Sequence, residues 1–358
     1  MDHPVAAAHL DPRLQRTAPN RPPGHSPRGG PALQVVLPVE RVVVQRIGVQ
    51  GDRTTQASDR LRELLAGPHG PARAERTEDR DHDATEVVVC YWTDPDEHTA
   101  WWTSEPVRTW WDDLPTQGPV GHWHETTTIP ADRIETMYSS PLAAGLAALA
   151  PSGLTDLHDY PGAMRDRFAA SDHTDLTTAA GTPLRTDLPP GTSPRGRRVR
   201  LLGPSPEGLC WVRTAQDWAS APADQVAAFQ DVVEPTYRAG YRHLATAPAE
   251  EGCLSAQLVG DLDPDGDPKR SSAVVAWFRG ITDLERWAHH HPTHHAILNA
   301  FWTALVAPYM EQLKLVLWHE VHVLPAGALE FEYVNCADGT GLLSVAGQGD
   351  QARADDAY

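Results

Sequence analysis

The chain has 358 residues, of which 41% are hydrophobic and 22% charged, as expected for a globular protein with one large core or two similar halves. Its formal net charge of −18 has no compensating basic stretch, which argues against binding to nucleic acid, because an acidic surface repels phosphate. No run of about 18 apolar residues occurs, so no membrane span is expected.

Both ends of the chain differ in composition from the middle. Residues 1–30 contain six prolines and four arginines but few large apolar side chains, which is typical of disorder. We therefore expect a disordered N-terminal arm over residues 1–34, with a transit peptide as the alternative, and a flexible tail over residues 344–358. Residues 35–343 are expected to form a single domain.

The first half of this domain alternates strand and helix patterns. Apolar runs predict strands at residues 39–49, 86–92 and 122–129. Helical patterns lie near residues 54–66 and from Asp96 onward. The polar, Pro/Gly-rich segment 171–197 follows, and we expect it to be a loop or a lid between two halves.

The second half follows a similar plan. Strands are predicted at residues 209–214, 253–262, 271–278 and 313–324. The helical patterns between them cover residues 223–244, with a break expected at Pro235, and residues 282–307. This order, β-α-β-β-α-β, is the ferredoxin-like plan.

A short internal repeat supports the idea of two equivalent halves. VVCYWTDPDEHTAW begins at Val88 and VVAWFRGITDLERW at Val274, and both read as a strand, a turn and a helix that reaches a tryptophan. The predicted fold class is therefore α+β, with two ferredoxin-like repeats (about residues 35–170 and 198–343) that pack into a single α+β barrel.

The four cysteines, Cys90, Cys210, Cys253 and Cys336, form no CxxC pair. A zinc ribbon and a covalent haem attachment motif are therefore not recognisable. A chain of this length does not need a disulfide framework, so we expect a reducing, cytoplasmic location.

Five histidines lie in the segment WAHHHPTHHAIL, residues 287–298, which is too far inside the chain to be a purification tag. Pro292 disfavours helix at the residue before it and suits the first turn of a new helix. In that helix, expected to span residues 292–307 and to be closed by Pro308, His294 shares a face with Ile297, Leu298, Phe301 and Leu305. His294 is therefore expected to point into an apolar interior.

The last predicted strand carries a second histidine of this kind. Alternation places His319 on one face with Leu313, Leu315, Leu317, Val321 and Val323, and it places His322 on the opposite face with Lys314 and Glu320, where we expect solvent. Each of His294 and His319 alone is compatible with an ordinary core histidine. A zinc site is a further alternative, because His291 and His295 have i,i+4 spacing, but HEVH at 319–322 is not HExxH. Together, His294 and His319 are compatible with an enclosed site that has one ligand and one acid–base group.

Five unusual segments occur in order between about Val35 and Leu343: AMRDRF (163–168), VRTAQDW (212–218), ERWAHHHPTHHAIL (285–298), LWHEV (317–321) and FEYVNC (331–336). They resemble signature segments of the aldoxime dehydratases, which use b-type haem. The resemblance implies a homodimeric haem protein of the dimeric α+β-barrel type that converts an aldoxime, as its small-molecule substrate, to a nitrile.

Transferred residue by residue, the resemblance makes His294 the axial ligand of ferrous haem b and His319 the catalytic acid–base. It assigns further catalytic roles to Arg167 and to Glu135 of RIETMY, and it aligns Thr214 with a serine of the family. Two other functions remain open: a haem oxidoreductase of the peroxidase or chlorite-dismutase type, and a non-catalytic haem carrier or sensor.

Overall fold

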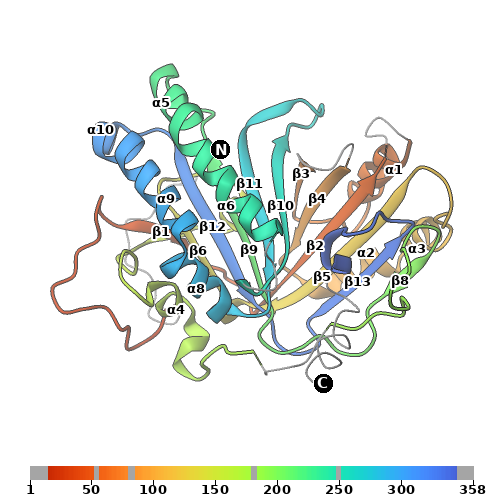
Figure 1. The fold of residues 1–358 in the computed structure, drawn as a ribbon. Helices are drawn as coiled ribbons and strands as arrows, with labels where there is room; N and C mark the ends of the chain where they lie inside the picture. Colours follow the sequence, from red (N-terminus) through yellow and green to blue (C-terminus); the bar gives the residue numbers. More distant parts are fainter. Residues whose placement is uncertain (1–14, 52–55, 80–84, 179–183, 247–250, 345–358) are drawn as a thin grey trace, which may run out of the picture.

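The computed structural model of the protein describes residues 15–51, 56–79, 85–178, 184–246 and 251–344. Its strands form one 13-stranded sheet in the order β7-β1-β6-β12-β9-β11-β10-β3-β4-β2-β5-β13-β8 (Figure 1). The mixed fold with a large antiparallel sheet agrees with the α+β class that the sequence predicts. Among the described residues, no helix has the length and apolar character needed to cross a membrane.

The N-terminal half contributes four neighbouring strands, in the spatial order β3-β4-β2-β5. Their bounds are β2 Arg41–Gln50, β3 Arg73–Asp79, β4 Thr85–Trp92 and β5 Gly121–Pro130. The helices of this half are α1 Gln56–Leu65, α2 Pro95–Thr103 and α3 Glu105–Asp112. Every residue of β4 is buried, and its valine-rich sequence shows no polar–apolar alternation because both faces of the strand are covered.

The C-terminal half repeats the arrangement with the strand order β12-β9-β11-β10. Its strands are β9 Cys210–Asp217, β10 Cys253–Leu262, β11 Pro268–Phe278 and β12 Val316–Val323. Its helices are α5 Ala223–Ala228, α6 Glu234–Thr246, α8 Ile281–His290, α9 Pro292–Phe301 and α10 Ala307–Tyr309. The two copies of the internal repeat occupy equivalent places, β4 with α2 and β11 with α8.

The two halves join where β10 pairs with β3, and further strands extend the sheet beyond them. Those strands are β1 Ala32–Val35, β6 Ile134–Tyr138, β7 Ser152–Thr155, β8 Arg198–Arg200 and β13 Leu329–Val334. A short helix, α4 Ala163–Asp166, comes between β7 and β8 in the sequence. The sheet therefore has two ends, β7 and β8, and its hydrogen-bond ladder does not close over the described residues.

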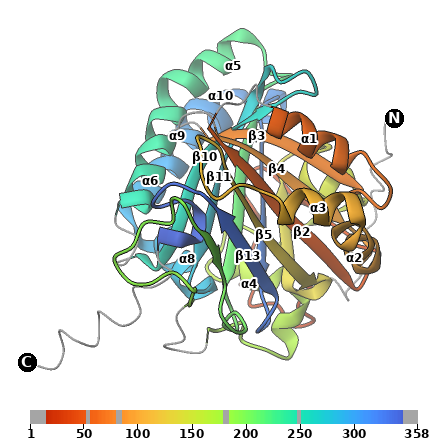
Figure 2. The ribbon, with the colours of Figure 1, turned by 90° about the vertical axis from the view of Figure 1, so that its right-hand side faces the viewer.

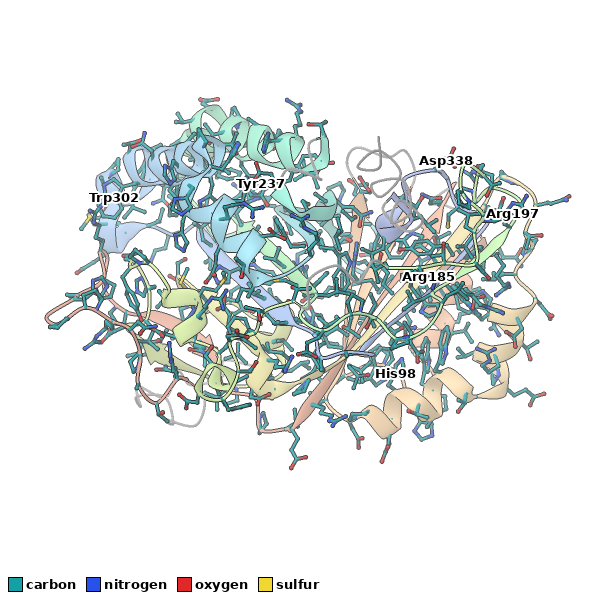
Figure 3. The ribbon with its side chains drawn as sticks, turned by 60° about the horizontal axis from the view of Figure 1, so that its bottom comes forward. His98, Arg185, Arg197, Tyr237, Trp302 and Asp338 are labelled. Atoms are coloured by element: carbon teal, nitrogen blue, oxygen red, sulfur yellow. The ribbon has the colours of Figure 1, made fainter. Side chains whose placement is uncertain are left out.

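Helices cover the outside of the curved sheet, and its inside holds the largest apolar cluster. Figure 2 shows α1–α3 on one side of the strands and α5, α6, α8 and α9 on the other. Side chains from both halves meet in the cluster between the strands, including Tyr91 and Trp123 from the first half and Trp211 and Trp318 from the second. Figure 3 shows how densely side chains fill the space, with Tyr237 and Trp302 on the C-terminal helical layer and His98 on the opposite side.

Two helical segments differ from the sequence prediction. The helix expected to break at Pro235 continues, because a π-helical turn at Phe229–Val233 joins α5 to α6 and changes the hydrogen-bond register just before the proline. A second π-helical turn, Trp302–Val306, joins α9 to α10, so Pro308 lies in the first turn of α10 and does not close the helix.

The N-terminal arm also differs from its prediction. Residues 15–34 are not disordered: the backbone of Thr17 donates to Asp172, the backbone of Arg28 donates to Asp159, and residues 32–35 form β1. The guanidinium of Arg28 lies 5.7 Å from the ring centre of Trp302. Before β1, hydrogen bonds to the exposed carboxylates of Asp159 and Asp172 hold this Pro-rich segment in place without a regular element, which its composition does not reveal. Residues 1–14 and 345–358 lie outside the described part.

Candidate functional site

The site begins as a row of side chains across three strands. His319 on β12 lies opposite Met137 on β6 and opposite Thr214 on β9. Because directly opposed residues of antiparallel strands point to the same face, these three side chains form one row. All three are half-buried, whereas Trp318 and Glu320, which alternate with His319, are buried. The row is therefore more accessible than the residues next to His319 on β12.

Glu135 and Arg167 lie beside His319. The Nε and Nη2 atoms of Arg167 donate to the Glu135 carboxylate at 2.9 and 3.3 Å. Nε2 of His319 is 3.0 Å from Oε1 of Glu135 and 3.4 Å from Nη2 of Arg167. The three side chains, expected in the site from the sequence, are thus brought into direct contact.

The charges around Glu135 keep it ionised. Burial alone would raise the pKa of this fully buried carboxyl, but the positive charges of Arg167 and His319 and their hydrogen bonds lower it to about 2. The ion pair gives His319 a partner in either protonation state. A protonated Nε2 donates to Glu135, and an unprotonated Nε2 accepts from Arg167.

Arg167 is held from several sides. It follows the last residue of α4, and its Nη1 donates to the carbonyl oxygen of Leu157 at 2.6 Å. Its own carbonyl oxygen accepts from Nε2 of Gln34 at 2.9 Å. The neighbouring Asp166 is bonded by the N-terminal arm, through the backbone of Asn20 at 2.7 Å. Sequence reasoning missed these supports, because they come from segments without a regular pattern.

His294 lies on α9, whose first residue is Pro292 and whose N-cap is His291. Its ring packs edge-on against Trp287 of α8, with 4.7 Å between ring centres. Its Nδ1 atom is buried and makes no hydrogen bond. Burial lowers the pKa of His294 to about 4, although the carbonyl group of Ala288 opposes the change. His294 is therefore neutral at neutral pH. The charges of His295, His289 and His319 also lower this pKa.

The protein covers the apolar side chains of α9 only in part. Ala300 is the only buried residue of the helix, and Ile297 and Phe301 are half-buried. Leu298, expected to point inward with His294, is 53% exposed. An apolar helix flank therefore remains open next to His294.

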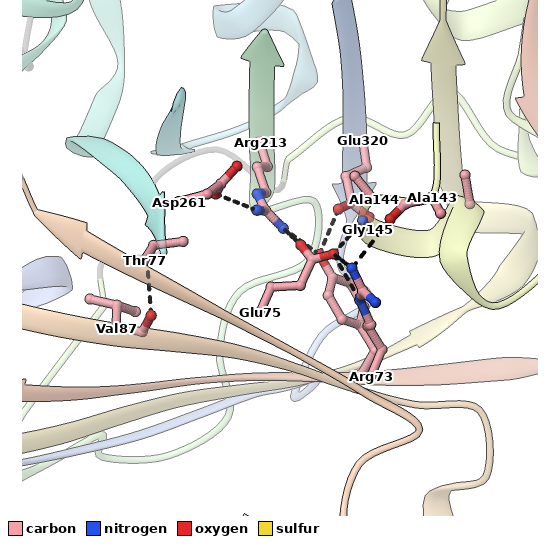
Figure 4. A network of polar contacts seen from close by, with 12 residues as sticks. Arg73, Glu75, Thr77, Val87, Ala143, Ala144, Gly145, Arg213, Asp261 and Glu320 are labelled. Atoms are coloured by element: carbon pink, nitrogen blue, oxygen red, sulfur yellow. Dashed lines mark hydrogen bonds and ion pairs between the residues drawn. The ribbon is translucent and has the colours of Figure 1, made fainter. Parts of the chain in front are cut away.

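The opposite face of β12 corrects another prediction. Glu320 and His322, expected in solvent, are 0% and 1% exposed, because this face packs against the interior of the curved sheet. Figure 4 shows the buried polar network there. Tyr91 donates to Glu320 at 2.6 Å, Arg213 donates to the Tyr91 hydroxyl at 3.1 Å, and Arg213 also pairs with Glu75 at 2.6 Å. The network supports the strands that carry His319 and Thr214.

Comparison with known proteins places the chain in a family. Residues 45–342 match the family described as haem-containing dehydratase. The chain belongs to that family. Among its relatives, phenylacetaldoxime dehydratase of Bacillus sp. (strain OxB-1) is 33% identical over 335 residues, covering 90% of this chain and 93% of the relative. Aliphatic aldoxime dehydratase of Rhodococcus erythropolis is 34% identical over 318 residues, covering 85% of this chain and 87% of the relative.

Solved structures of aldoxime dehydratase agree with the fold. A crystal structure of aldoxime dehydratase in complex with butyraldoxime superposes with a TM-score of 0.84 at 30% identity, covering 94% of this chain and 96% of the other. A second crystal structure of aldoxime dehydratase superposes with a TM-score of 0.83 at 30% identity, covering 94% of this chain and 98% of the other. The family resemblance that the sequence predicts is thus confirmed.

Proposed function

We propose that this chain is an aldoxime dehydratase, which converts R–CH=N–OH to R–C≡N and water with haem b in the ferrous state. Membership in the haem-containing dehydratase family and the names of its relatives support this reaction. The observation that carries the assignment to this site is the contact of His319 with the buried Glu135–Arg167 ion pair, together with a neutral histidine, His294, on the apolar helix α9.

The residues around His294 fit a haem group. A neutral imidazole has a lone pair for iron, and the lowered pKa keeps His294 in this form. The open apolar flank of α9, with Leu298 exposed and Ile297 half-buried, suits the face of a porphyrin. The half-buried row of Met137, His319 and Thr214 has the acid–base and hydroxyl groups that a substrate pocket requires.

His294 would hold the haem group, and ferrous haem, when bound, would supply electron density that weakens the N–O bond of the aldoxime. Hydroxide is a poor leaving group, so the departing oxygen needs a proton. His319 gives this proton, releasing water, and then accepts the proton lost from the aldoxime carbon as the triple bond forms. The enzyme ends with its initial number of protons, and such catalysis contributes about 10²–10⁴-fold.

The remaining residues position His319 and the substrate. If Nε2–H of His319 donates to Glu135, the proton that His319 exchanges with the substrate is the one on Nδ1. The Glu135 carboxylate then stabilises the ring when both nitrogens carry a hydrogen. Arg167 neutralises the buried Glu135 carboxylate. Thr214, directly opposite His319, has a hydroxyl that can orient the oxime oxygen.

We further propose that the two halves are ferredoxin-like repeats of one haem-binding domain of the dimeric α+β-barrel type, over residues 35–343, and that the protein forms a homodimer. The equivalent strand orders of the halves support the repeats. The four buried, unpaired cysteines are compatible with work in the reducing cytoplasm.

Absorption spectra and product analysis test the proposed reaction. The dithionite-reduced protein should change its haem spectrum on addition of phenylacetaldoxime or butyraldoxime, and gas chromatography should detect the nitrile. A ferric protein that turns over hydrogen peroxide rapidly, while the reduced protein leaves both aldoximes intact, would identify an oxidoreductase instead.

Three variants test the residue assignments. His294→Ala should lose haem but keep its far-UV circular dichroism, while His295→Ala, on the same helix, should keep haem as a control. His319→Ala should keep haem and lose about 100-fold or more in turnover. If His319→Ala turned over the aldoxime at the rate of the wild type, the catalytic role of His319 would be wrong. If His294→Ala bound haem normally, His294 would not be the haem ligand.

A further inference from the structure

A second group of potential ligands lies beside the helix that carries His294. His243 is on α6, Glu251 lies two residues before β10, and His291 is the N-cap of α9. One ligand atom from each lies within 4.8 Å of the others. None of the three contacts the Glu135–Arg167–His319 group, so the proposed dehydration makes no use of them.

The distances in this group match a metal site. Nε2 of His243 and Nε2 of His291 are 3.0 and 3.6 Å from the same oxygen, Oε1 of Glu251. In a tetrahedral zinc site, bonds of about 2.0–2.1 Å place neighbouring ligand atoms about 3.3 Å apart. The two imidazole rings stack with their centres 4.0 Å apart and an angle of 22° between planes, so both rings present Nε2 to one side. Small shifts of these side chains would complete the coordination.

The surroundings of His291 also suit a ligand. Its Nδ1 atom lies 2.7 Å from the Thr293 hydroxyl oxygen. If Nδ1 carries the hydrogen and donates it to Thr293, the lone pair is at Nε2, where the metal would bind. A hydrogen bond of this kind from the second ring nitrogen commonly orients metal-binding histidines. Thr293 would then give up its backbone hydrogen bond to Nδ1, which at 3.3 Å is the longer of the two contacts.

The group is accessible enough to bind and release an ion. The side chains of His243, Glu251 and His291 are 24%, 12% and 23% exposed. Three protein ligands at the surface leave one tetrahedral position for water. His295, which the sequence spacing pairs with His291, is turned away, because its Nε2 bonds to the carbonyl oxygen of His289 at 2.7 Å.

We propose that His243, Glu251 and His291 form a binding site for a divalent transition metal of the zinc class, separate from the haem site. The bound ion would connect α6, the segment before β10 and the N-cap residue of α9. Because α9 carries His294, the ion would hold in place the helix whose packing orients that histidine. The proposal is independent of the aldoxime reaction, since it concerns only metal binding and the position of α9.

Calorimetric titration of the haem-loaded protein with zinc chloride tests the site. The wild type should bind one zinc ion per chain. His243→Ala and Glu251→Gln should each weaken binding at least about tenfold, and Thr293→Val should weaken it about 10–100-fold by removing the orienting hydroxyl. His290→Ala is the matched control, because this exposed histidine lies next to His291 but outside the group. It should bind zinc like the wild type.

Absorption spectroscopy at the zinc edge gives a second readout, to which haem iron does not contribute. Two imidazole nitrogens and one or two oxygens at about 2.0–2.1 Å are expected in the wild type. An unchanged haem spectrum in each variant shows that it remains folded. The proposal is wrong if the wild type binds no zinc, if His243→Ala and Glu251→Gln bind it as tightly as the wild type, or if His290→Ala loses binding equally.

Discussion

Replacing Glu135 by glutamine preserves the size of this side chain but removes the negative charge beside Arg167 and His319. Arg167 is only 3% exposed, so its charge would remain in the interior without a carboxylate partner. Breaking a buried ion pair in this way costs about 3–5 kcal/mol of unfolding free energy. The pKa of Glu135 gives a similar figure, since lowering it from 4.5 to about 2 corresponds to about 3 kcal/mol, at about 1.4 kcal/mol per unit.

The pH dependence of this stabilisation has a definite sign. Because the folded-state pKa is the lower one, the stabilisation is complete above pH 4.5 and is lost as the pH falls toward 2. Urea unfolding at neutral and mildly acidic pH should therefore give the same difference of about 3 kcal/mol between wild type and Glu135→Gln. This difference in unfolding free energy between the two proteins should become smaller only below pH 4.5.

A surface ion pair provides the control for this measurement. Glu207 is 35% exposed and pairs with Arg133, so Glu207→Gln should cost less than about 1 kcal/mol. The reasoning is refuted if Glu135→Gln costs as little as this control at neutral pH. It is also refuted if the difference disappears well above pH 4.5, because the carboxyl would then have an ordinary pKa or a different partner.

Three further predictions concern the site and its support. Thr214→Ser should keep most of kcat/KM for an aldoxime, whereas kcat/KM of Thr214→Val should fall about tenfold, because one hydrogen bond to the substrate is lost. Equal kcat/KM values for the two variants would exclude an orienting role for the hydroxyl. Hemin binding to the haem-free protein should stay constant as the pH falls through 6.5 and weaken near pH 4, where His294 gains a proton; a midpoint at 6.5 would contradict the burial of His294. Tyr91→Phe should lower the unfolding free energy by about 1–3 kcal/mol, because Glu320 loses a buried hydrogen bond; an unchanged urea midpoint would show that the network reorganises without cost.

Some strands were predictable from the sequence and others were not. β10 has the predicted bounds, Cys253–Leu262, because its apolar run meets clear turn residues at both ends. β3, with the sequence RAERTED, was missed, because charged residues dominate it. It becomes a strand by pairing with β4 on one side and β10 on the other, and its Glu75 is paired with Arg213 of β9. Only the neighbouring strands make this sequence extended.

Local spacing predicted the orientation of His294 and His319, the two histidines of the proposed site. Pro292 and the i,i+4 positions predict a helix that presents His294, and strand alternation separates His319 from His322. The structure has both elements, as α9 and β12. Periodicity is sufficient here because it reports the direction of a side chain relative to its own helix or strand.

Only the tertiary structure decided which faces are buried and which distant residues meet. His322 and Glu320 were expected in solvent, but the curved sheet folds back over their face and buries them. Glu135, Arg167 and His319 come from β6, the end of α4 and β12, and no sequence spacing relates them. The physical reason is that local sequence directs a side chain, whereas its surroundings depend on the segments that pack against it from elsewhere in the chain.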